Sequence, residues 1–419
     1  MTVRARHRAA GPTGARDGPR TGRRALLALL VGGLSSGGNL LLAITVTRLE
    51  SVGGLGQFAL AFSFYILGSG LVRSTVTDTV LATGTGVVAS AARRAILLGV
   101  VSGALISAAG AASGSPYLVV VGLALPGLVL YDYAKAIAVG IGAPSGAMAQ
   151  EITWAALTAC AALAGLLGLI DAPHVFALWA VGGGLVGLVV AARHRYALLP
   201  GWRVGRAETR VAAGFGAQFL LTTGSAQLAL TAVALVAGTA VVGALSAGRT
   251  LLGPVNLVLS TAATLILPQL ARTRADSGAA RTRTAVRLAL LVAAAVLPLT
   301  IAVALLPDAV GTALLGANWT VGRSLLVLLA LESLLAVPAA IGFAGLRVEQ
   351  ASRRAIVLGI LLGGLRVPAV VAGAVLFGAP GAAGALVVLA LVSAVAWGGS
   401  YLLLLRDRAV DRTLAAQPA

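Results

Sequence analysis

The sequence predicts an all-α integral membrane protein with about twelve transmembrane helices, arranged as two six-helix lobes. Apolar residue types make up 58% of the 419 residues, charged types make up 11%, and the mean hydropathy is +0.97. The apolar residues come in about twelve long blocks, and about 20 such residues suffice for a helix to cross a bilayer. Basic residues also alternate between successive connections, and a weak repeat relates the two halves of the chain.

The expected spans follow one another with short connections. The first block is the clearest, because no charge occurs from Ala25 to Val46. Several prolines fall inside later spans, where neighbouring helices can satisfy the freed carbonyls. Gly253-Pro254 is the preferred hinge among them, although a static kink fits equally well. We place the spans at residues 25–47, 55–81, 93–112, 116–138, 149–170, 173–192, 211–236, 241–270, 285–306, 322–346, 353–377 and 382–405.

Positive charge is confined to one set of connections. Of the 31 Lys and Arg residues, 26 fall in the tails and in alternate connections, while the other set holds only Arg48 and Arg323. Because basic loops remain in the cytoplasm, both termini are expected there, with the chain in the plasma membrane. A net charge of +18 would suggest nucleic acid in a soluble protein, but this placement favours anionic membrane lipid and no nucleic-acid partner.

The repeat supports a division into two halves. Residues 36–43 in the first span resemble residues 224–231 in the seventh, at an offset of 188 residues. Six helices per half give parallel repeats about an axis along the membrane normal, which is an architecture of secondary transporters. We therefore expect a basic cytoplasmic tail over 1–24, an N-terminal lobe over 25–192, a cytoplasmic central loop over 193–210, a C-terminal lobe over 211–405 and a cytoplasmic tail over 406–419.

Charged side chains inside the spans are the candidate binding site, because burying each one in lipid costs several kcal/mol. Arg73, Arg249 and Arg366 are expected to line a central cavity, where guanidinium groups suit a phosphate or pyrophosphate. For Arg73 and Arg249, snorkelling toward the membrane surface is the simpler alternative. Glu332 lies at the depth of Arg366, so an ion pair between the two is expected, either in the cavity or as a lock between helices.

Four more charged residues, Asp78, Asp132, Lys135 and Glu151, are interpreted as an inner gate or as structural. Asp132 and Lys135 are spaced i,i+3 and can pair on one helix face. Asp78 lies five residues after Arg73, which places the two on different faces of an α-helix. Glu151 is expected to open its helix, where a carboxylate complements the helix N-terminus.

Two uncharged polar residues occupy matching places in the repeat. Asn39 in the first span corresponds to Gln227 in the seventh. We expect both to line the cavity and to contact substrate hydroxyl groups.

Other familiar motifs carry no chemistry here. Residues 182–187 match G-x-G-x-x-G but lie in an apolar span without a preceding strand, so they indicate helix packing. The three histidines are scattered, so no metal site is expected. Cys160 is expected to be a buried, inert thiol. We therefore expect no catalytic residue, no cofactor and no enzymatic activity.

The chain resembles the polysaccharide-type flippases of the multidrug/oligosaccharidyl-lipid/polysaccharide (MOP) superfamily, the group that includes O-antigen-type flippases. The resemblance spans most of residues 25–405 and rests on loose patterns. Where the family has basic residues between helices 4 and 5, this chain has the apolar stretch 140–144. The patterns are Gly56-Gln57-Phe58-Ala59-Leu60-Ala61, Tyr131-Asp132-Tyr133-Ala134-Lys135 with Glu151 and Trp154, residues 247–254, and Leu267-Pro268-Gln269-Leu270.

The resemblance implies a V-shaped bundle of six plus six helices working by alternating access. The implied substrate is a polyprenyl-pyrophosphate-linked oligosaccharide, moved from the inner to the outer leaflet for polysaccharide or cell-envelope biosynthesis, with polysaccharide-assembly proteins as possible partners. An ion-coupled exporter of drugs or small solutes, MATE-like, is the alternative. A third interpretation, an integral-membrane glycan polymerase, is disfavoured because the outer connections lack carboxylate or basic clusters.

Overall fold

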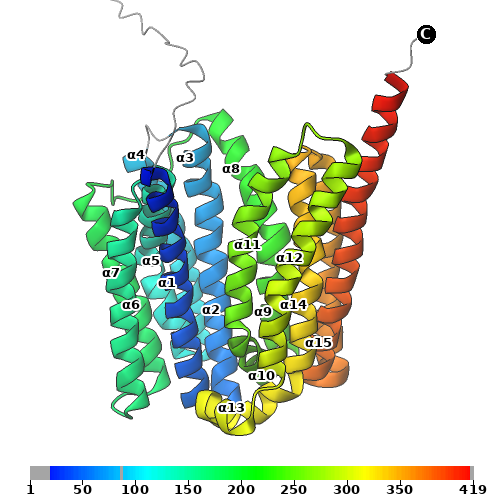
Figure 1. Cartoon of the computed structure of the whole chain (residues 1–419). Helices are drawn as coiled ribbons and strands as arrows, with labels where there is room; N and C mark the ends of the chain where they lie inside the picture. Colours follow the sequence, from blue (N-terminus) through cyan, green and yellow to red (C-terminus); the bar gives the residue numbers. More distant parts are fainter. Residues whose placement is uncertain (1–18, 85–87, 416–419) are drawn as a thin grey trace, which may run out of the picture.

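The computed structural model describes residues 19–84 and 88–415, and this part of the chain forms helices without strands (Figure 1). Eleven continuous helical stretches are long and apolar enough to cross a membrane. The last of them contains two crossings, because α15 bends at Gly378, where φ is +63°. The described part therefore makes the twelve crossings that the hydropathy predicts, and the all-α membrane fold is confirmed.

The crossings of the first half contain one π-helical segment. The elements are α1 (Pro19–Leu49), α2 (Val52–Val72), η1 (Arg73–Thr77), α3 (Asp78–Thr83), α4 (Val88–Ser113), α5 (Pro116–Gly140), α6 (Pro144–Leu166) and α7 (Ala172–Arg193). Residues 52–83 form a single crossing, and α1 already begins at Pro19, inside the stretch expected to be a tail. Residues 1–18 of that expected tail lie outside the described residues.

The second half repeats the order with an added short helix, α13, between two crossings. The elements are α8 (Arg206–Phe219), η3 (Leu220–Gly224), α9 (Ser225–Val236), α10 (Thr239–Leu251), α11 (Gly253–Arg272), α12 (Gly278–Ala304), α13 (Asp308–Leu315), η4 (Gly316–Asn318), α14 (Trp319–Val348) and α15 (Ser352–Ala415). Gly253-Pro254 opens α11 at the break with α10, which is where the sequence placed a hinge or kink.

Local signals explain where several helices begin. Ser51 accepts a hydrogen bond from Gly54 N at the start of α2, and Asp171 accepts one from His174 N at the start of α7. Such side chains satisfy backbone donors that a helix start leaves free. Gly238 turns the chain between α9 and α10 with φ at +93°, a conformation that favours glycine.

Glycine permits close helix packing in the N-terminal lobe. A Cβ atom at Gly187 of α7 would overlap the carbonyl oxygen of Gly127 in α5, and one at Gly103 of α4 would overlap that of Gly122 in α5. Small residues let membrane helices approach to backbone contact, which replaces the hydrophobic driving force that lipid removes. The glycine-rich stretch 182–187 thus packs helices, as its apolar surroundings predicted.

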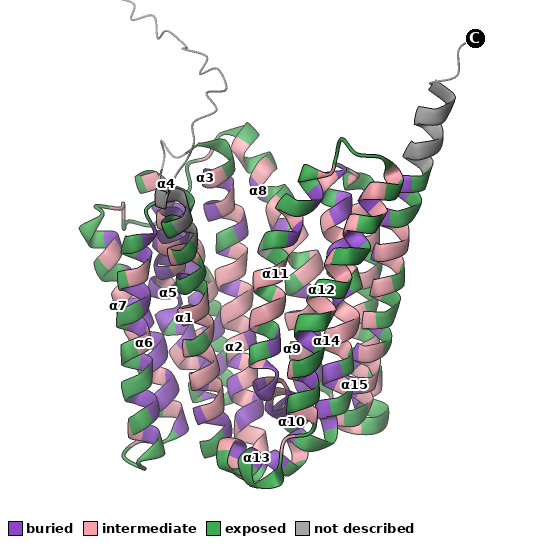
Figure 2. Cartoon of the chain, viewed as in Figure 1, coloured by how far each residue is buried: buried purple, intermediate pink, exposed green. Residues whose placement is uncertain are grey.

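The same neighbour relations recur in the second lobe. In the first half α1 packs on α6, α4 on α5 and α5 on α7. In the second half α9 packs on the first part of α15, α12 on α14, and α14 on the last part of α15, where Gly342 meets Trp397. Figure 2 shows exposed residues along the outward faces of α6, α7 and α15, which is where lipid is expected to lie.

The two lobes meet unequally at their two ends. At the α13 end, Gly56 of α2 packs on the Thr239 backbone and Gly243 packs on that of Val52. On the α1 side, Leu40 contacts Gly253, whereas Gly32 and Gly33, nearer the start of α1, have no neighbour within 4 Å of a built Cβ atom. The lobes therefore converge at the α13 end and part on this side toward the end where α1 starts (Figure 1).

The glycine contacts predict a selective sensitivity to added side chains. Gly187→Ala should destabilise the protein by about 1–3 kcal/mol, because the new methyl meets rigid backbone. Gly146→Ala, in open space, should cost little. Thermal melting of the purified protein in detergent measures both, and equal melting temperatures would contradict the packing argument.

Candidate functional site

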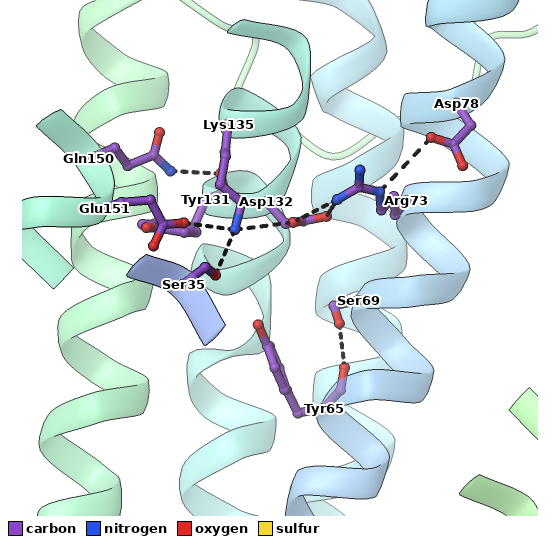
Figure 3. A network of polar contacts seen from close by, with 10 residues as sticks. All are labelled: Ser35, Tyr65, Ser69, Arg73, Asp78, Tyr131, Asp132, Lys135, Gln150 and Glu151. Atoms are coloured by element: carbon purple, nitrogen blue, oxygen red, sulfur yellow. Dashed lines mark hydrogen bonds and ion pairs between the residues drawn. The ribbon is translucent and has the colours of Figure 1, made fainter. Parts of the chain in front are cut away.

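Lys135 is the centre of a polar network inside the N-terminal lobe (Figure 3). Its Nζ lies 2.8 Å from Glu151 Oε1 on α6, 3.8 Å from Asp132 Oδ1 on its own helix, and 3.3 Å from Ser35 Oγ on α1. The expected i,i+3 contact between Asp132 and Lys135 is therefore present. The Glu151 side chain is only 2% exposed, so the ammonium group neutralises a carboxylate that lipid would not tolerate.

Glu151 does not open its helix, contrary to the expectation from the sequence. Helix α6 begins at Pro144, so Glu151 lies two turns inside it. The two residues Pro144 and Gly146 gave no apolar signal, and the start of the helix was therefore placed too late. The carboxylate complements Lys135 rather than the helix N-terminus.

Arg73 extends the network toward the second lobe. Its Nη1 lies 3.3 Å from Asp132 Oδ1, and its Nε lies 4.0 Å from Asp78 Oδ1. The prediction that Arg73 and Asp78 occupy different faces was wrong, because residues 73–77 are π-helical and Asp78 N bonds to Arg73 O. An i→i+5 turn brings residues five apart onto one face, and single π-turns of this kind are frequent at functional sites.

Aromatic rings pack against the charged network. Lys135 Nζ lies 5.2 Å from the centroid of the Tyr131 ring, which contacts the Trp154 ring at 4.5 Å. Trp154 stacks on Trp179 at 5.2 Å and donates from Nε1 to the Trp179 carbonyl at 2.8 Å. Gln150 Nε2 also holds the Tyr131 carbonyl at 2.7 Å. Ser35, Gln150 and Trp179 were not predicted as site residues, because none of them carries a charge that would mark it within an apolar span.

The C-terminal lobe holds a second, smaller charge cluster. Arg249 Nη2 donates to both carboxylate oxygens of Glu332, at 3.2 and 3.3 Å. The expected pair between Glu332 and Arg366 is therefore wrong. The position of a residue along its helix does not say in which lateral direction its side chain points, and the pairing depends on that direction.

Among the described residues, Arg366 has neutral oxygen atoms as its hydrogen-bond contacts. Its Nη1 lies 3.5 Å from the carbonyl of Thr222 in the π-helical segment η3 and 3.5 Å from Ser225 Oγ. Within the described residues no carboxylate lies within 4.0 Å of this guanidinium group. Arg366 is thus the in-span cation whose charge is least neutralised.

A pocket of about 260 Å³ adjoins the Arg249–Glu332 pair. Asn256 and Ser333 add polar groups to its wall, and Leu252, Leu259, Leu329 and Ala336 complete the lining. The pair is a quarter to a third exposed, so water or a ligand reaches it. This pocket lies between α10, α11 and α14 of the C-terminal lobe.

Asn39 and Gln227 do not share a pocket. Asn39 lies beside Glu151, Trp154 and Trp179 in a small recess of the N-terminal lobe. Gln227 is half-buried on α9, and no side-chain hydrogen bond is found for it among the described residues. The repeat therefore relates their places along the chain, while their surroundings differ.

Charge balance distinguishes the two lobes. The N-terminal network combines Arg73 and Lys135 with Asp78, Asp132 and Glu151, which leaves one negative charge when all are ionised. The C-terminal cluster combines Arg249 and Arg366 with Glu332, which leaves one positive charge. The three arginines thus belong to two separate clusters instead of one cavity lining.

No group of three His, Cys, Asp or Glu side chains in residues 19–84 and 88–415 is arranged to hold a metal ion.

No protein-family model and no curated protein matches the sequence. Solved structures do match. One is the outward-facing conformation of a multidrug resistance MATE family transporter of the MOP superfamily, with a TM-score of 0.59 and 14% identity over 93% of this chain and 96% of that chain.

The chain has the fold of the MATE transporters. The inward-facing conformation of a MATE transporter also matches, with a TM-score of 0.56 and 16% identity over 91% of this chain and 99% of that chain. A MOP superfamily transporter from Pyrococcus furiosus, described as having a binding pocket of reverse polarity, matches with a TM-score of 0.51. Its identity is 15% over 92% of this chain and 95% of that chain. At these identities the MATE likeness establishes the architecture, and the flippase subtype suggested by the sequence is left as a proposal.

The C-terminal pairing predicts which charge exchange is tolerated. Arg249→Glu or Glu332→Arg alone should lower the amount of folded protein, since each leaves like charges together at a cost of about 1–3 kcal/mol. The double exchange should restore it. Exchanging Glu332 with Arg366 should give no rescue, and rescue by that exchange in a size-exclusion assay would contradict the observed pairing.

The N-terminal network predicts a larger loss. Lys135→Met leaves Glu151 buried without its cation and should cost about 3–5 kcal/mol. Adding Glu151→Gln to this variant should recover much of the stability, because the uncompensated charge is removed. Thermal melting gives both values, and a double variant no more stable than Lys135→Met would argue against the ion pair.

Proposed function

We propose that this protein is a membrane transporter that works by alternating access, with its substrate bound between the two lobes and the basic end in the cytoplasm. The observation that carries the proposal is the unequal contact between lobes that each hold their own charge cluster. Tight glycine contacts close the α13 end, whereas Gly32 and Gly33 near the start of α1 face no neighbour and the lobes stay joined at that end through α8, where Gly216 packs on Thr75. The MATE fold supports the same mechanism.

The closed end contains a latch between the lobes. Asn318, which is 2% exposed at the start of α14, donates from Nδ2 to the carbonyls of Thr47 and Glu50, each at 2.7 Å. These carbonyls belong to the last turn of α1 and its end, where intrahelical partners are missing. Thr47 Oγ1 also lies 3.4 Å from Thr250 Oγ1 of the other lobe. Opening toward the α13 side must break these contacts.

The first candidate substrate class is a drug-like or other small solute exported in exchange for an ion. This reading follows the multidrug MATE transporters with the same fold. The N-terminal network supplies an excess carboxylate beside the buried Glu151, which suits a coupling proton or cation. Substrate and coupling ion would then use different lobes.

The second candidate is a polyprenyl-pyrophosphate-linked oligosaccharide, flipped to the outer leaflet for envelope or polysaccharide assembly. Arg366 favours it, because a guanidinium group without a carboxylate partner suits a phosphate. Asn39 and Gln227 would contact sugar hydroxyls in this reading, and polysaccharide-assembly proteins would be partners. The sequence resemblance to polysaccharide-type flippases supports this candidate.

Proteoliposome assays separate the candidates. Ethidium transport driven by an ion gradient tests the exporter, and leaflet accessibility of a labelled polyprenyl-pyrophosphate oligosaccharide tests the flippase. Arg366→Gln should slow a pyrophosphate substrate at least about tenfold, the value of one charged hydrogen bond, and a cationic drug much less. Arg323→Gln, at an exposed pair with Asp308 on the α13 side, is the control and should match the wild type.

Glu151→Gln should slow transport of whichever substrate moves, because removing one of the network's three carboxylates also removes its net negative charge. Purified, monodisperse protein that moves neither substrate faster than empty vesicles would contradict both candidates.

The latch predicts a shift in conformation. Asn318→Ala should raise the aqueous maleimide reactivity of a Thr47→Cys reporter on the order of tenfold in a Cys160→Ser background, since two hydrogen bonds of about 0.5–1.5 kcal/mol each are lost. Ser324→Ala, whose hydroxyl bonds only within α14, should leave the reactivity unchanged. Equal reactivity in all three proteins would remove the latch from the mechanism.

A further inference from the structure

A groove of about 820 Å³ runs between α6 and α7 on the outer side of the N-terminal lobe. Both helices pack against α1, α5 and each other, and neither makes an extended contact with the second lobe. Figure 1 places them at the edge of the bundle farthest from the lobe interface. The groove is therefore separate from the proposed transport pathway.

The groove wall is apolar and incompletely covered by protein. Leu157, Leu178, Leu185 and Val189 line it, and they are between 42% and 57% exposed. Along α7 the lining runs from Leu178 to His194, which is about 24 Å at about 1.5 Å per residue. One leaflet of hydrocarbon is about 15 Å deep, so a full acyl chain fits along the groove.

One end of the groove carries positive charge. Arg193, the last residue of α7, and His194 line the groove at the end where α6 begins. Among the described residues no carboxylate lies within salt-bridge distance of Arg193. An apolar groove that ends at a guanidinium group with no carboxylate partner in the described part of the chain matches an amphiphile with an anionic head and a hydrocarbon tail.

We infer that the α6–α7 groove binds one anionic phospholipid, with an acyl chain along the groove and its phosphate against Arg193. The lipid would come from the leaflet at the basic end of the bundle. The site also touches the charge network, because Gln150 lines the groove while holding the Tyr131 carbonyl, and its neighbour Glu151 pairs with Lys135. Lipid in the groove would stabilise α6 in the position that forms this pair.

A native cysteine in the groove can report whether the groove is occupied. Cys160 lines it and is exposed, so the expectation of a buried thiol was wrong: the residue faces outward from an apolar helix. It is also the only cysteine in the sequence. Its reactivity toward a lipid-soluble maleimide therefore reports on groove occupancy without further engineering.

The test uses the full chain in nanodiscs of phosphatidylcholine, with and without phosphatidylglycerol. We expect phosphatidylglycerol to slow labelling of Cys160 and to remain bound in native mass spectra. Arg193→Gln should weaken this retention at least about tenfold, the value of one charge-assisted hydrogen bond. Arg203→Gln, in the same connection but outside the groove lining, should retain the lipid like the wild type.

Filling the groove gives an independent variant. Gly182→Leu places a side chain in the lining, where only Leu157 is near, and should displace the lipid without changing the charge. Equal retention of phosphatidylcholine and phosphatidylglycerol by the wild type would overturn the inference. Equal losses in Arg193→Gln and Arg203→Gln would do the same, and so would displacement of phosphatidylglycerol by equimolar polyprenyl phosphate.

Discussion

The requirement that charge in a membrane be neutralised locally determines how this protein is built. Five ionisable groups of the N-terminal lobe are linked through Asp132 and Lys135, and Glu332 neutralises Arg249 in the other lobe. These in-span pairs each lie within one lobe, whereas a buried pair between Arg94 of α4 and Glu208 of α8 joins the two halves near the basic end. What joins the lobes near the α13 end is weaker: glycine contacts and hydrogen bonds to the end of α1.

Glycine packing in the N-terminal lobe positions the aromatic rings and, through them, Lys135. Glycine lets α5 and α7 pack to backbone contact, which fixes Trp179 and Trp154 under the Tyr131 ring. The aromatic layer then holds Lys135 where it can reach helices α1 and α6 as well as its own. A lobe stiffened in this way can move as a unit, which is what exchange of access between two membrane sides demands.

The fold was largely predictable from the sequence because a helix that crosses lipid needs a long apolar segment, and basic connections stay on one side of the membrane. Length, hydropathy and the alternation of basic connections set the number and order of crossings, and the helix break at Gly253 was visible as a Gly-Pro pair. The site was only partly predictable. Asp132 and Lys135 are neighbours on one helix, so their pairing follows from periodicity. The Arg249–Glu332 pair depends on how each helix is rotated about its own axis, which the sequence does not specify. The Arg73–Asp78 contact depends on a π-helical turn that no local residue pattern predicts. Cys160 shows the same limit, since an apolar block does not say which residues face lipid.

The central claim is that the two lobes move as bodies and open at alternate ends, and spin-label distances test it most directly. In a Cys160→Ser background, one label pair at Leu199 and Arg274 spans the basic end, and another at Leu169 and Leu305 spans the α13 end. Double electron–electron resonance on proteoliposomes measures the distance within each label pair. When an ion gradient or substrate is applied, the distance at one end should increase while the distance at the other end decreases. A single unchanged distance at both ends, in protein that still transports, would contradict the account.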